Sequence, residues 1–188
     1  MKQQLFTAIK LTVICILFFA GLYTLLIWGI AQATPEHGNG TTIQANGKTV
    51  GYALEGQQFN QDRYFWSRPS AAAYNASASS GSNKGPSNPA YLKDVADRLD
   101  SFLVHNPGIQ KEAVPAELVT ASGSGLDPDI SVPAARVQIK RIAKMRNITE
   151  EQVSNLIHKH TTPAFLGIFG PSFVNVLQLN IALDAVGK

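Results

Sequence analysis

The chain has 188 residues and a mass of 20.2 kDa, a length that fits one ordinary domain with a further segment and excludes two large domains. Its 15 glycines and 10 prolines are close to average usage, so collagen-like and wholly disordered proteins are excluded as well. Residues 1–33 contain two lysines and no acidic residue, which leaves residues 34–188 near neutral. The pI of 9.0 therefore does not indicate nucleic-acid binding.

An apolar segment begins at Leu11 and continues to Ile30 almost without interruption. It is long enough to cross a hydrocarbon core of ~30 Å as a helix. The small residues Ala31 and Ala33 resemble a signal-peptide cleavage site, but the apolar region of a signal peptide is normally only ~7 to 15 residues long. We therefore expect a retained transmembrane helix.

The charges around this segment predict its orientation. Lys2 and Lys10 precede it, and Glu36 is the first charged residue after it. Because positively charged residues favour the cytoplasmic side of a membrane, we expect the N-terminus in the cytoplasm and the remainder outside. The predicted parts are a cytoplasmic N-terminus over residues 1–10, a transmembrane helix over 11–31 and an extracytoplasmic domain over 34–188.

Small residues lie inside the predicted transmembrane helix. Ala20, Gly21 and Thr24 form a patch where another membrane helix can approach closely. Cys15, the only cysteine of the chain, also lies in this helix. The extracytoplasmic domain is therefore expected to be held by its core, without disulfides.

The sequence predicts that the extracytoplasmic domain begins with a β-hairpin. Asn46-Gly47 predicts a two-residue turn between strands over 41–45 and 48–53, because both residues tolerate a positive φ. Gly47-Lys48-Thr49 is similar to the end of a phosphate-binding loop. The earlier glycine that such a loop needs is missing, since Thr42 stands there, and the hairpin turn is favoured.

Residues 70–89 consist largely of Ala, Ser, Asn, Gly and Pro. This composition is typical of a flexible linker. The same residue types also suit a tight loop with many hydrogen bonds from side chains to the backbone. We expect an ordered loop here.

Helices and strands are predicted along the rest of the chain. Asn88-Pro89 begins a helix to about residue 104, and Thr149 with Gln152 forms a capping box for a helix to about residue 160. Strands at both ends with helices between them predict an α+β domain. The further expected elements are a strand over 117–121, a helix capped by Ser131 with Ala135, Ile139 and Ile142 on one face and Arg136, Lys140 and Lys144 on the other, and an alternating strand over 174–184.

Few residues of the sequence suggest a catalytic or metal-binding role. His158 and His160 are two positions apart, so their side chains point in different directions on a helix, and a role at the helix C-terminus is favoured over metal binding. The sequence has no Gly-x-Ser-x-Gly motif and no catalytic constellation. A run of basic residues either docks an acidic partner or lipid headgroups or forms a solvated helix face; its members are Arg136, Lys140, Arg141, Lys144 and Arg146.

Five stretches stand out by their order and spacing. They are YFWSRPSA at 64–71, GSN-x-GPSNP at 81–89, PAELVTASGSGLD at 115–127 leading to Ile130-Ser131, AA-x-x-Q-x-x-RIA at 134–143 and VNVLQLNIALD at 174–184. Together with the N-terminal anchor, they resemble the C subunit of the Kdp-type potassium-transporting P-type ATPase.

The resemblance implies a non-catalytic accessory subunit of an ATP-driven, high-affinity potassium uptake complex in the bacterial cytoplasmic (inner) membrane, needed for assembly. It implies as partners the ATPase subunit, the channel-like potassium-binding subunit, a small additional membrane subunit and the lipid bilayer, and no nucleic acid. No cofactor or metal is implied for this chain itself, and ATP is implied for the complex.

The resemblance also implies candidate site residues. The family is described as a catalytic chaperone that raises the ATP affinity of the ATPase subunit, with a proposed nucleotide contact at Leu54, Gly56 and Gln57. The expected topology argues against this contact, because these residues would lie on the side of the membrane without ATP. The candidate partner contacts are Tyr64, Phe65, Trp66, Arg68, Asn83, Gly85, Gly21 and Thr24.

Two questions stay open at this point. The rigid guanidinium fork of Arg68 either supports the folded domain or contacts a partner. For the whole chain, the alternatives are an anchored extracytoplasmic enzyme, which the missing catalytic constellation disfavours, and a membrane-anchored extracytoplasmic ligand-binding module.

Overall fold

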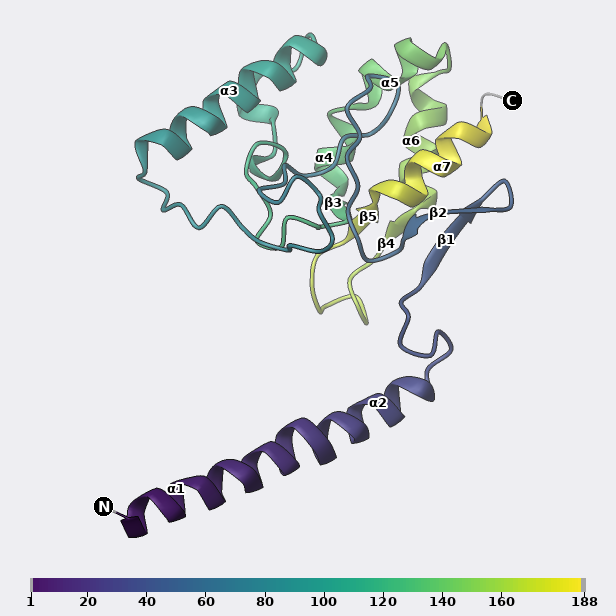
Figure 1. Ribbon diagram of the computed structural model, residues 1–188. Coiled ribbons are helices and arrows are strands. Elements are labelled where there is room, and N and C mark those ends of the chain that lie inside the picture. Colours follow the sequence, from purple (N-terminus) through teal and green to yellow (C-terminus); the bar gives the residue numbers. More distant parts are fainter. Residues whose placement is uncertain (1, 187–188) are drawn as a thin grey trace. The chain divides into compact units, whose positions relative to one another are not determined.

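The computed structural model describes residues 2–186 (Figure 1). The chain divides into two compact units, with the boundary between Thr41 and Thr42. The first unit contains one continuous helix, Lys2–Gln32, of 31 residues with a mean hydropathy of 2.4 in its most apolar window. At ~1.5 Å per residue this helix is longer than a ~30 Å hydrocarbon core, so it is long and apolar enough to cross a membrane. It comprises α1 (Lys2–Cys15), a π-helical stretch (Ile16–Tyr23) and α2 (Thr24–Gln32).

The second unit begins with the predicted hairpin. β1 (Thr42–Ala45) and β2 (Lys48–Tyr52) pair in antiparallel fashion. Asn46 and Gly47 have φ values of 51° and 74°, and a type I′ turn needs a positive φ at both positions. The hairpin interpretation of this segment is therefore confirmed.

A small antiparallel sheet lies within the described part of the second unit. Its central strand places Val174 between Ile130 on one side and Thr161 on the other. The strands are β3 (Asp129–Ser131), β4 (Thr161–Thr162) and β5 (Phe173–Asn175), in the order β3-β5-β4.

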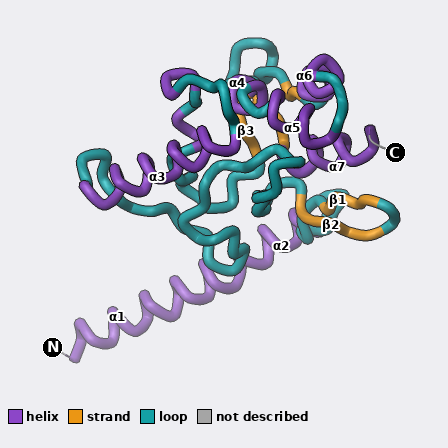
Figure 2. The backbone as a smooth tube through the Cα atoms, turned by 90° about the horizontal axis from the view of Figure 1, so that it is seen from above, coloured by secondary structure: helices purple, strands orange, loops and turns teal. Residues whose placement is uncertain are grey.

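The helices of the second unit form two groups. One helix lies on one side of the domain, the others lie together on the opposite side, and loops fill much of the space between them (Figure 2). The mixed helix and sheet content agrees with the predicted α+β class. The separate helix is α3 (Pro89–His105), and the group comprises α4 (Val132–Arg136), α5 (Ile139–Arg146), α6 (Glu150–Lys159) and α7 (Val176–Val186).

Two helices begin at the caps that the sequence indicates. The side chain of Asn88 accepts the backbone N–H of Tyr91 at 3.1 Å and starts α3. At α6, the N–H of Gln152 donates to Thr149 Oγ1 at 3.1 Å, and the N–H of Thr149 donates to Gln152 Oε1 at 2.9 Å. Both predicted helices are confirmed.

The helix expected after Ser131 is divided. Ser131 Oγ accepts the N–H of Ala134 at 3.2 Å and caps α4 as predicted, but α4 ends at Arg136 and α5 begins at Ile139. Between the two helices, Gln138 turns its side chain inward and is fully buried. The basic residues expected on the solvent face, Arg136, Lys140 and Lys144, are exposed.

The strand predicted over 117–121 is wrong. Residues Ala116–Leu118 form a 3₁₀ turn, like Lys111–Ala113 before it. Leu118 and Val119 are both buried although they are neighbours, whereas successive side chains of a strand point to opposite faces. Glu117 accepts the N–H of Ser131 with Oε1 at 3.0 Å, so this turn is fixed by a distant backbone group.

The strand predicted over 174–184 is also wrong beyond Asn175. Asn175 Oδ1 accepts the N–H of Gln178 at 3.1 Å, and α7 begins there. The alternating pattern placed Asn180 on the solvent face, but its side chain is 2% exposed. The buried residues of α7 follow a helical spacing instead: Val176, Leu177, Leu179, Asn180 and Leu183.

Candidate partner-binding site

The centre of the domain is an irregular segment, residues 62–70, which we call the aromatic segment. Phe65 at its middle is 0% exposed and belongs to the core. The N–H of Phe65 donates to Asn180 Oδ1 at 2.8 Å, and its carbonyl accepts from Asn180 Nδ2 at 3.0 Å. Gln138 bonds the backbone of Trp66 in the same manner, at 2.8 and 3.4 Å. Side-chain amides therefore satisfy the buried backbone groups that a neighbouring strand would otherwise pair.

Arg141 fixes the aromatic segment from α5. Its Nη1 donates to the carbonyls of Tyr64, at 2.9 Å, and of Asp62, while Nη2 donates to Gln138 Oε1 at 2.7 Å. The guanidinium lies 4.6 Å from the centroid of the Trp66 ring. Burial lowers the pKa of Arg141 to about 10, opposed by the charge of Asp62, so the group stays protonated at neutral pH.

Two of the five basic residues of the predicted run are therefore not part of a solvated face. Arg141 is 5% exposed. Arg146 Nη2 lies 2.6 Å from Asp184 Oδ1, and its Nε donates to the carbonyl of Arg63 at 2.8 Å. Asp184 Oδ2 also accepts the hydroxyl of Tyr64 at 3.0 Å. These contacts join α5, the aromatic segment and α7.

A groove of about 490 Å³ lies between the aromatic segment and α3. Trp66 stands edge-on to Phe102, with centroids 6.3 Å apart, and to His105, at 5.0 Å. Nδ1 of His105 and Oδ1 of Asp62 are 2.8 Å apart, so the end of α3 lies against the aromatic segment. The groove is thus lined both by aromatic side chains and by the charged residues Asp97 and Arg98.

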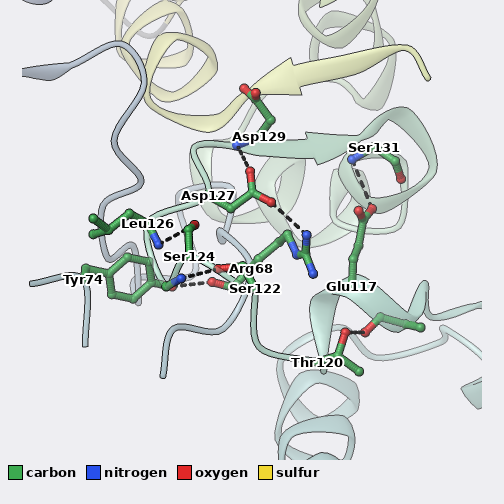
Figure 3. Close-up of polar contacts among 12 residues, drawn as sticks. Arg68, Tyr74, Glu117, Thr120, Ser122, Ser124, Leu126, Asp127, Asp129 and Ser131 are labelled. Carbon is green, nitrogen blue, oxygen red and sulfur yellow. Dashed lines mark hydrogen bonds and ion pairs between the residues drawn. The ribbon is translucent and has the colours of Figure 1, made fainter. Parts of the chain in front are cut away.

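Arg68 forms an ion pair within the domain (Figure 3). Its Nη1 lies 2.8 Å from Asp127 Oδ2, and both side chains are about a quarter exposed. Asp127 Oδ1 accepts the N–H of Asp129 at 3.1 Å, and the carbonyl of Arg68 accepts the hydroxyl of Tyr74 at 2.7 Å. Burial raises the pKa of Asp129, and the charge of Asp127 raises it further. Burial also raises the pKa of Tyr74, opposed by the charge of Arg98.

The loop that follows the aromatic segment is ordered over its first half. Ser70 Oγ donates to the carbonyl of Gly125 at 2.6 Å, and Ser79 Oγ donates to that of Ser124 at 2.8 Å. The expectation of an ordered loop is met there. Farther on, Asn83 and Gly85 are exposed, and a Cβ at Gly85 would meet nothing within 4 Å.

The candidate nucleotide residues lie after β2, and two of them already have partners inside the domain. The N–H of Gly56 donates to the carbonyl of Leu126 at 2.7 Å, and a Cβ at Gly56 would lie 2.4 Å from Asp127 O. Gln57 Nε2 donates to the carbonyl of Val50 at 2.9 Å. Leu54 is 80% exposed.

The two candidate residues of the N-terminal helix lie at the end of the π-helical stretch. Thr24 Oγ1 donates to the carbonyl of Phe19 at 3.0 Å, within its own helix. A Cβ at Gly21 would meet nothing within 4 Å. The helix surface is therefore open at Gly21, as close packing of another helix would require.

The comparisons with known proteins identify the family. A family model described as "K+-transporting ATPase, c chain" (KdpC) matches residues 5–185. The chain belongs to the KdpC family. Proteins named "Potassium-transporting ATPase KdpC subunit" are 50% identical over 185 residues in Bacteroides thetaiotaomicron and 50% identical over 182 residues in Flavobacterium johnsoniae, covering 97% of this chain and 98% of each relative. A relative of the same name in Dechloromonas aromatica is 46% identical over 192 residues and covers 100% of both chains.

Family membership confirms the resemblance that the five sequence stretches indicate. Within residues 2–186 of this KdpC chain, no group of three or more His, Cys, Asp or Glu side chains is placed to hold a metal ion. His158 and His160 lie at the C-terminal end of α6. The groove and the exposed surface around it provide apolar contact area and charged groups. Protein-binding surfaces have these features.

The sequence reasoning missed one conspicuous group of residues in this KdpC chain. Between β4 and β5, Phe165, Leu166, Ile168 and Phe169 are all exposed. The available signal was an apolar run between Pro163 and Pro171 without a charged residue. Exposed apolar residues gathered in this way mark interaction surfaces.

Proposed function

We propose that this chain is a non-catalytic accessory subunit of a potassium-transporting ATPase complex. The match of the KdpC family model to residues 5–185 carries this proposal, because it covers the helix and the domain together. The relatives are named for a potassium-transporting ATPase, and the family resemblance implies three partner subunits. They are the ATPase subunit, the channel-like potassium-binding subunit and a small additional membrane subunit.

The N-terminal helix anchors the chain in the bacterial inner membrane, with residues 1–10 inside and the domain from residue 34 outside. The apolar helix Lys2–Gln32 and the position of Lys2 and Lys10 before its most apolar part support this orientation. Protease added to cells with a permeable outer layer should cleave the domain. Cleavage only after the membrane has been inverted would reverse the orientation.

The domain contacts its partners through the groove beside Trp66, the exposed side of α3 and the loop at Asn83 and Gly85. Tyr64, Phe65 and Arg68 support this surface from within, since their contacts lie inside the domain. Any increase in the ATP affinity of the ATPase subunit is transmitted through these contacts and the membrane subunits. Leu54, Gly56 and Gln57 do not hold nucleotide, because Gly56 and Gln57 are engaged in the domain.

A matched pair of variants tests this assignment. Ser101 is an exposed residue of α3 that lines the groove, and Asn155 is an exposed residue of α6 outside it. Ser101→Arg should reduce co-purification of the ATPase and channel-like subunits and weaken the apparent ATP affinity of the complex, whereas Asn155→Arg should change neither. Thermal unfolding of both variants checks that the domain is intact.

Co-purification also separates this function from its alternative. A chain that is always extracted without an ATPase partner would contradict the subunit assignment. The groove of about 490 Å³ would then support an anchored ligand-binding module, since its volume lies in the range of small-molecule sites.

A further inference from the structure

The loop between β4 and β5 is a concentrated apolar protrusion. We call residues 163–171 the apolar loop. Phe165, Leu166, Ile168 and Phe169 are 70%, 74%, 77% and 60% exposed. No Asp, Glu, Lys or Arg occurs between Lys159 and Asp184. Large apolar side chains grouped in this way are costly in water, which makes the apolar loop a contact surface.

The backbone of the apolar loop is closed by its own hydrogen bonds. The N–H groups of Phe165 and Phe169 each donate to the carbonyl of the other at 2.9 Å, and the N–H of Gly167 donates to the carbonyl of Ala164 at 2.9 Å. Leu166 and Gly167 have φ values of 53° and 77°, which form the tight turn. Few backbone donors at the tip therefore need water. A segment that enters an apolar phase must meet this condition, because hydrocarbon offers no hydrogen-bond partner.

The apolar loop lies at the end of the domain where the chain enters. Figure 1 shows the β4–β5 loop and the start of β1 at the same end of the second unit. Residues 33–41 connect α2 to β1. At ~3.3 to 3.6 Å per residue, the ten steps from Gln32 to Thr42 allow Thr42 to lie at most about 36 Å from the end of the helix. A bilayer that holds the helix is therefore within reach of this end of the domain.

We propose that the apolar loop inserts into the lipid bilayer that holds the N-terminal helix. This inference rests on the anchoring part of the proposed function. The rings of Phe165 and Phe169 lie next to each other, with centroids 6.4 Å apart, and all four large side chains are at least 60% exposed, so the domain itself does not cover them. Acyl chains are fluid and cover every side. Lys159, which is exposed just before β4, is placed to meet anionic headgroups at the rim.

A second membrane contact has a mechanical consequence for the complex. A domain joined to its helix by a short connection alone can rotate about that connection. Insertion of the apolar loop fixes a second point, so the domain keeps one face toward the membrane. The groove and α3 are then presented to the neighbouring subunits in a constant orientation, which lowers the entropy lost on assembly.

Fluorescence of the full chain in vesicles of phosphatidylcholine and phosphatidylglycerol tests the proposal. Cys15 is the only cysteine, so Cys15→Ala provides a cysteine-free background. An environment-sensitive dye is attached at Ile168→Cys, and in a separate chain at Val104→Cys. Val104 is the matched control because it is also apolar and is 78% exposed, but it lies on α3. Lipids with a spin label near the headgroup serve as quenchers.

We expect a blue-shifted emission and strong quenching by the spin-labelled lipid for the dye at position 168, and solvent-like emission without quenching at position 104. Adding Leu166→Asp and Phe169→Asp should abolish the quenching at position 168, since two carboxylates oppose insertion. Quenching that survives this double substitution would overturn the proposal.

Three further outcomes would count against the proposal. Solvent-like emission at position 168 in a chain that stays in the vesicles through carbonate extraction overturns insertion while leaving the anchor intact. A blue shift without lipid quenching, seen only when the ATPase subunits are reconstituted together with the chain, assigns the apolar loop to a protein contact. Release of the chain from the vesicles by carbonate would contradict membrane anchoring by the N-terminal helix. It would therefore overturn both the proposed anchoring and the insertion of the apolar loop.

Discussion

Asn180 on α7 and Phe65 in the aromatic segment are joined by two hydrogen bonds, of 2.8 and 3.0 Å, across 115 positions of the chain. The amide of Asn180 needs both its donor and its acceptor for this pair. Asn180→Asp should therefore lower the free energy of unfolding at neutral pH by ~2 to 3 kcal/mol, since it removes the donor and leaves a buried charge and an unpaired carbonyl.

Denaturant unfolding of the full chain in detergent measures this change. Asn155→Asp is the matched control, because Asn155 is an exposed amide on the neighbouring helix α6. It should change the free energy of unfolding by less than ~0.5 kcal/mol. Equal effects of the two substitutions would contradict a structural role for the Asn180 pair.

Arg141→Lys should destabilise the domain although it keeps the charge. The guanidinium serves Asn106, Gln138 and two carbonyls at once, and an ammonium cannot reach this set of acceptors. We expect a loss of ~3 kcal/mol, because acceptors are left unpaired in a buried place. Lys144→Ala on the exposed face of α5 is the control and should unfold at nearly the original temperature. A stable Arg141→Lys domain would show that the acceptors find other donors.

Titration of Asp129 should make the free energy of unfolding depend on pH. Its pKa is raised in the folded domain above the ordinary value of 3.8, by burial first and by Asp127 second. The folded state therefore binds the proton more tightly, and the stability that Asp129 contributes falls as the pH rises from about 3.8 through the folded pKa. Asp129→Asn keeps an oxygen that can accept from Asn175 and avoids the buried charge.

The Asp129→Asn domain should accordingly be more stable than the original at pH 7, with an advantage that shrinks toward pH 4. Denaturant unfolding of both chains at the two pH values measures the difference. An advantage of the same size at both pH values would trace the effect to something other than titration of Asp129.

Two substitutions in the Leu54–Gln57 region separate nucleotide binding from folding. Leu54→Ala changes an exposed side chain, so the apparent ATP affinity of the assembled ATPase and the unfolding temperature should both stay the same. Gly56→Ala puts a Cβ 2.4 Å from Asp127 O, which should destabilise the domain by ~1 to 3 kcal/mol. A loss of ATP affinity in the Leu54→Ala complex, without a loss of stability, would establish a nucleotide contact at Leu54.

The elements that could be predicted from the sequence are those with local signals. Asn46-Gly47 specifies its turn through backbone preference alone. Asn88 and the Thr149–Gln152 pair cap their helices through residues three positions apart. None of these signals depends on the rest of the fold, and each of these elements was predicted within a few residues of its observed bounds.

The elements that could not be predicted depend on distant partners. Asn180 was assigned to a solvent face because polar and apolar residues alternate over 174–184, and the backbone of Phe65 that offsets the cost of burying its amide lies far away in the chain. Arg141 was assigned to a run of basic residues that either docks an acidic partner or lipid headgroups or forms a solvated face, and the carbonyl of Tyr64 that it binds is equally distant in the chain. An ordered loop was expected after the aromatic segment, but its partners, the carbonyls of Ser124 and Gly125, are not revealed by the composition of the segment.

The closure of the core by α7 sets the order of events during synthesis. Phe65 emerges from the ribosome long before Asn180, which satisfies its backbone, and before Leu179 and Leu183, which share its hydrophobic cluster. Phe65 therefore cannot complete its buried contacts until α7 has been synthesised, and until then its side chain and its backbone groups lack these partners. The domain can complete its core only after α7 has been made. A small deletion in α7 should therefore lower the yield of folded chain during biogenesis, before the chain can join an ATPase complex.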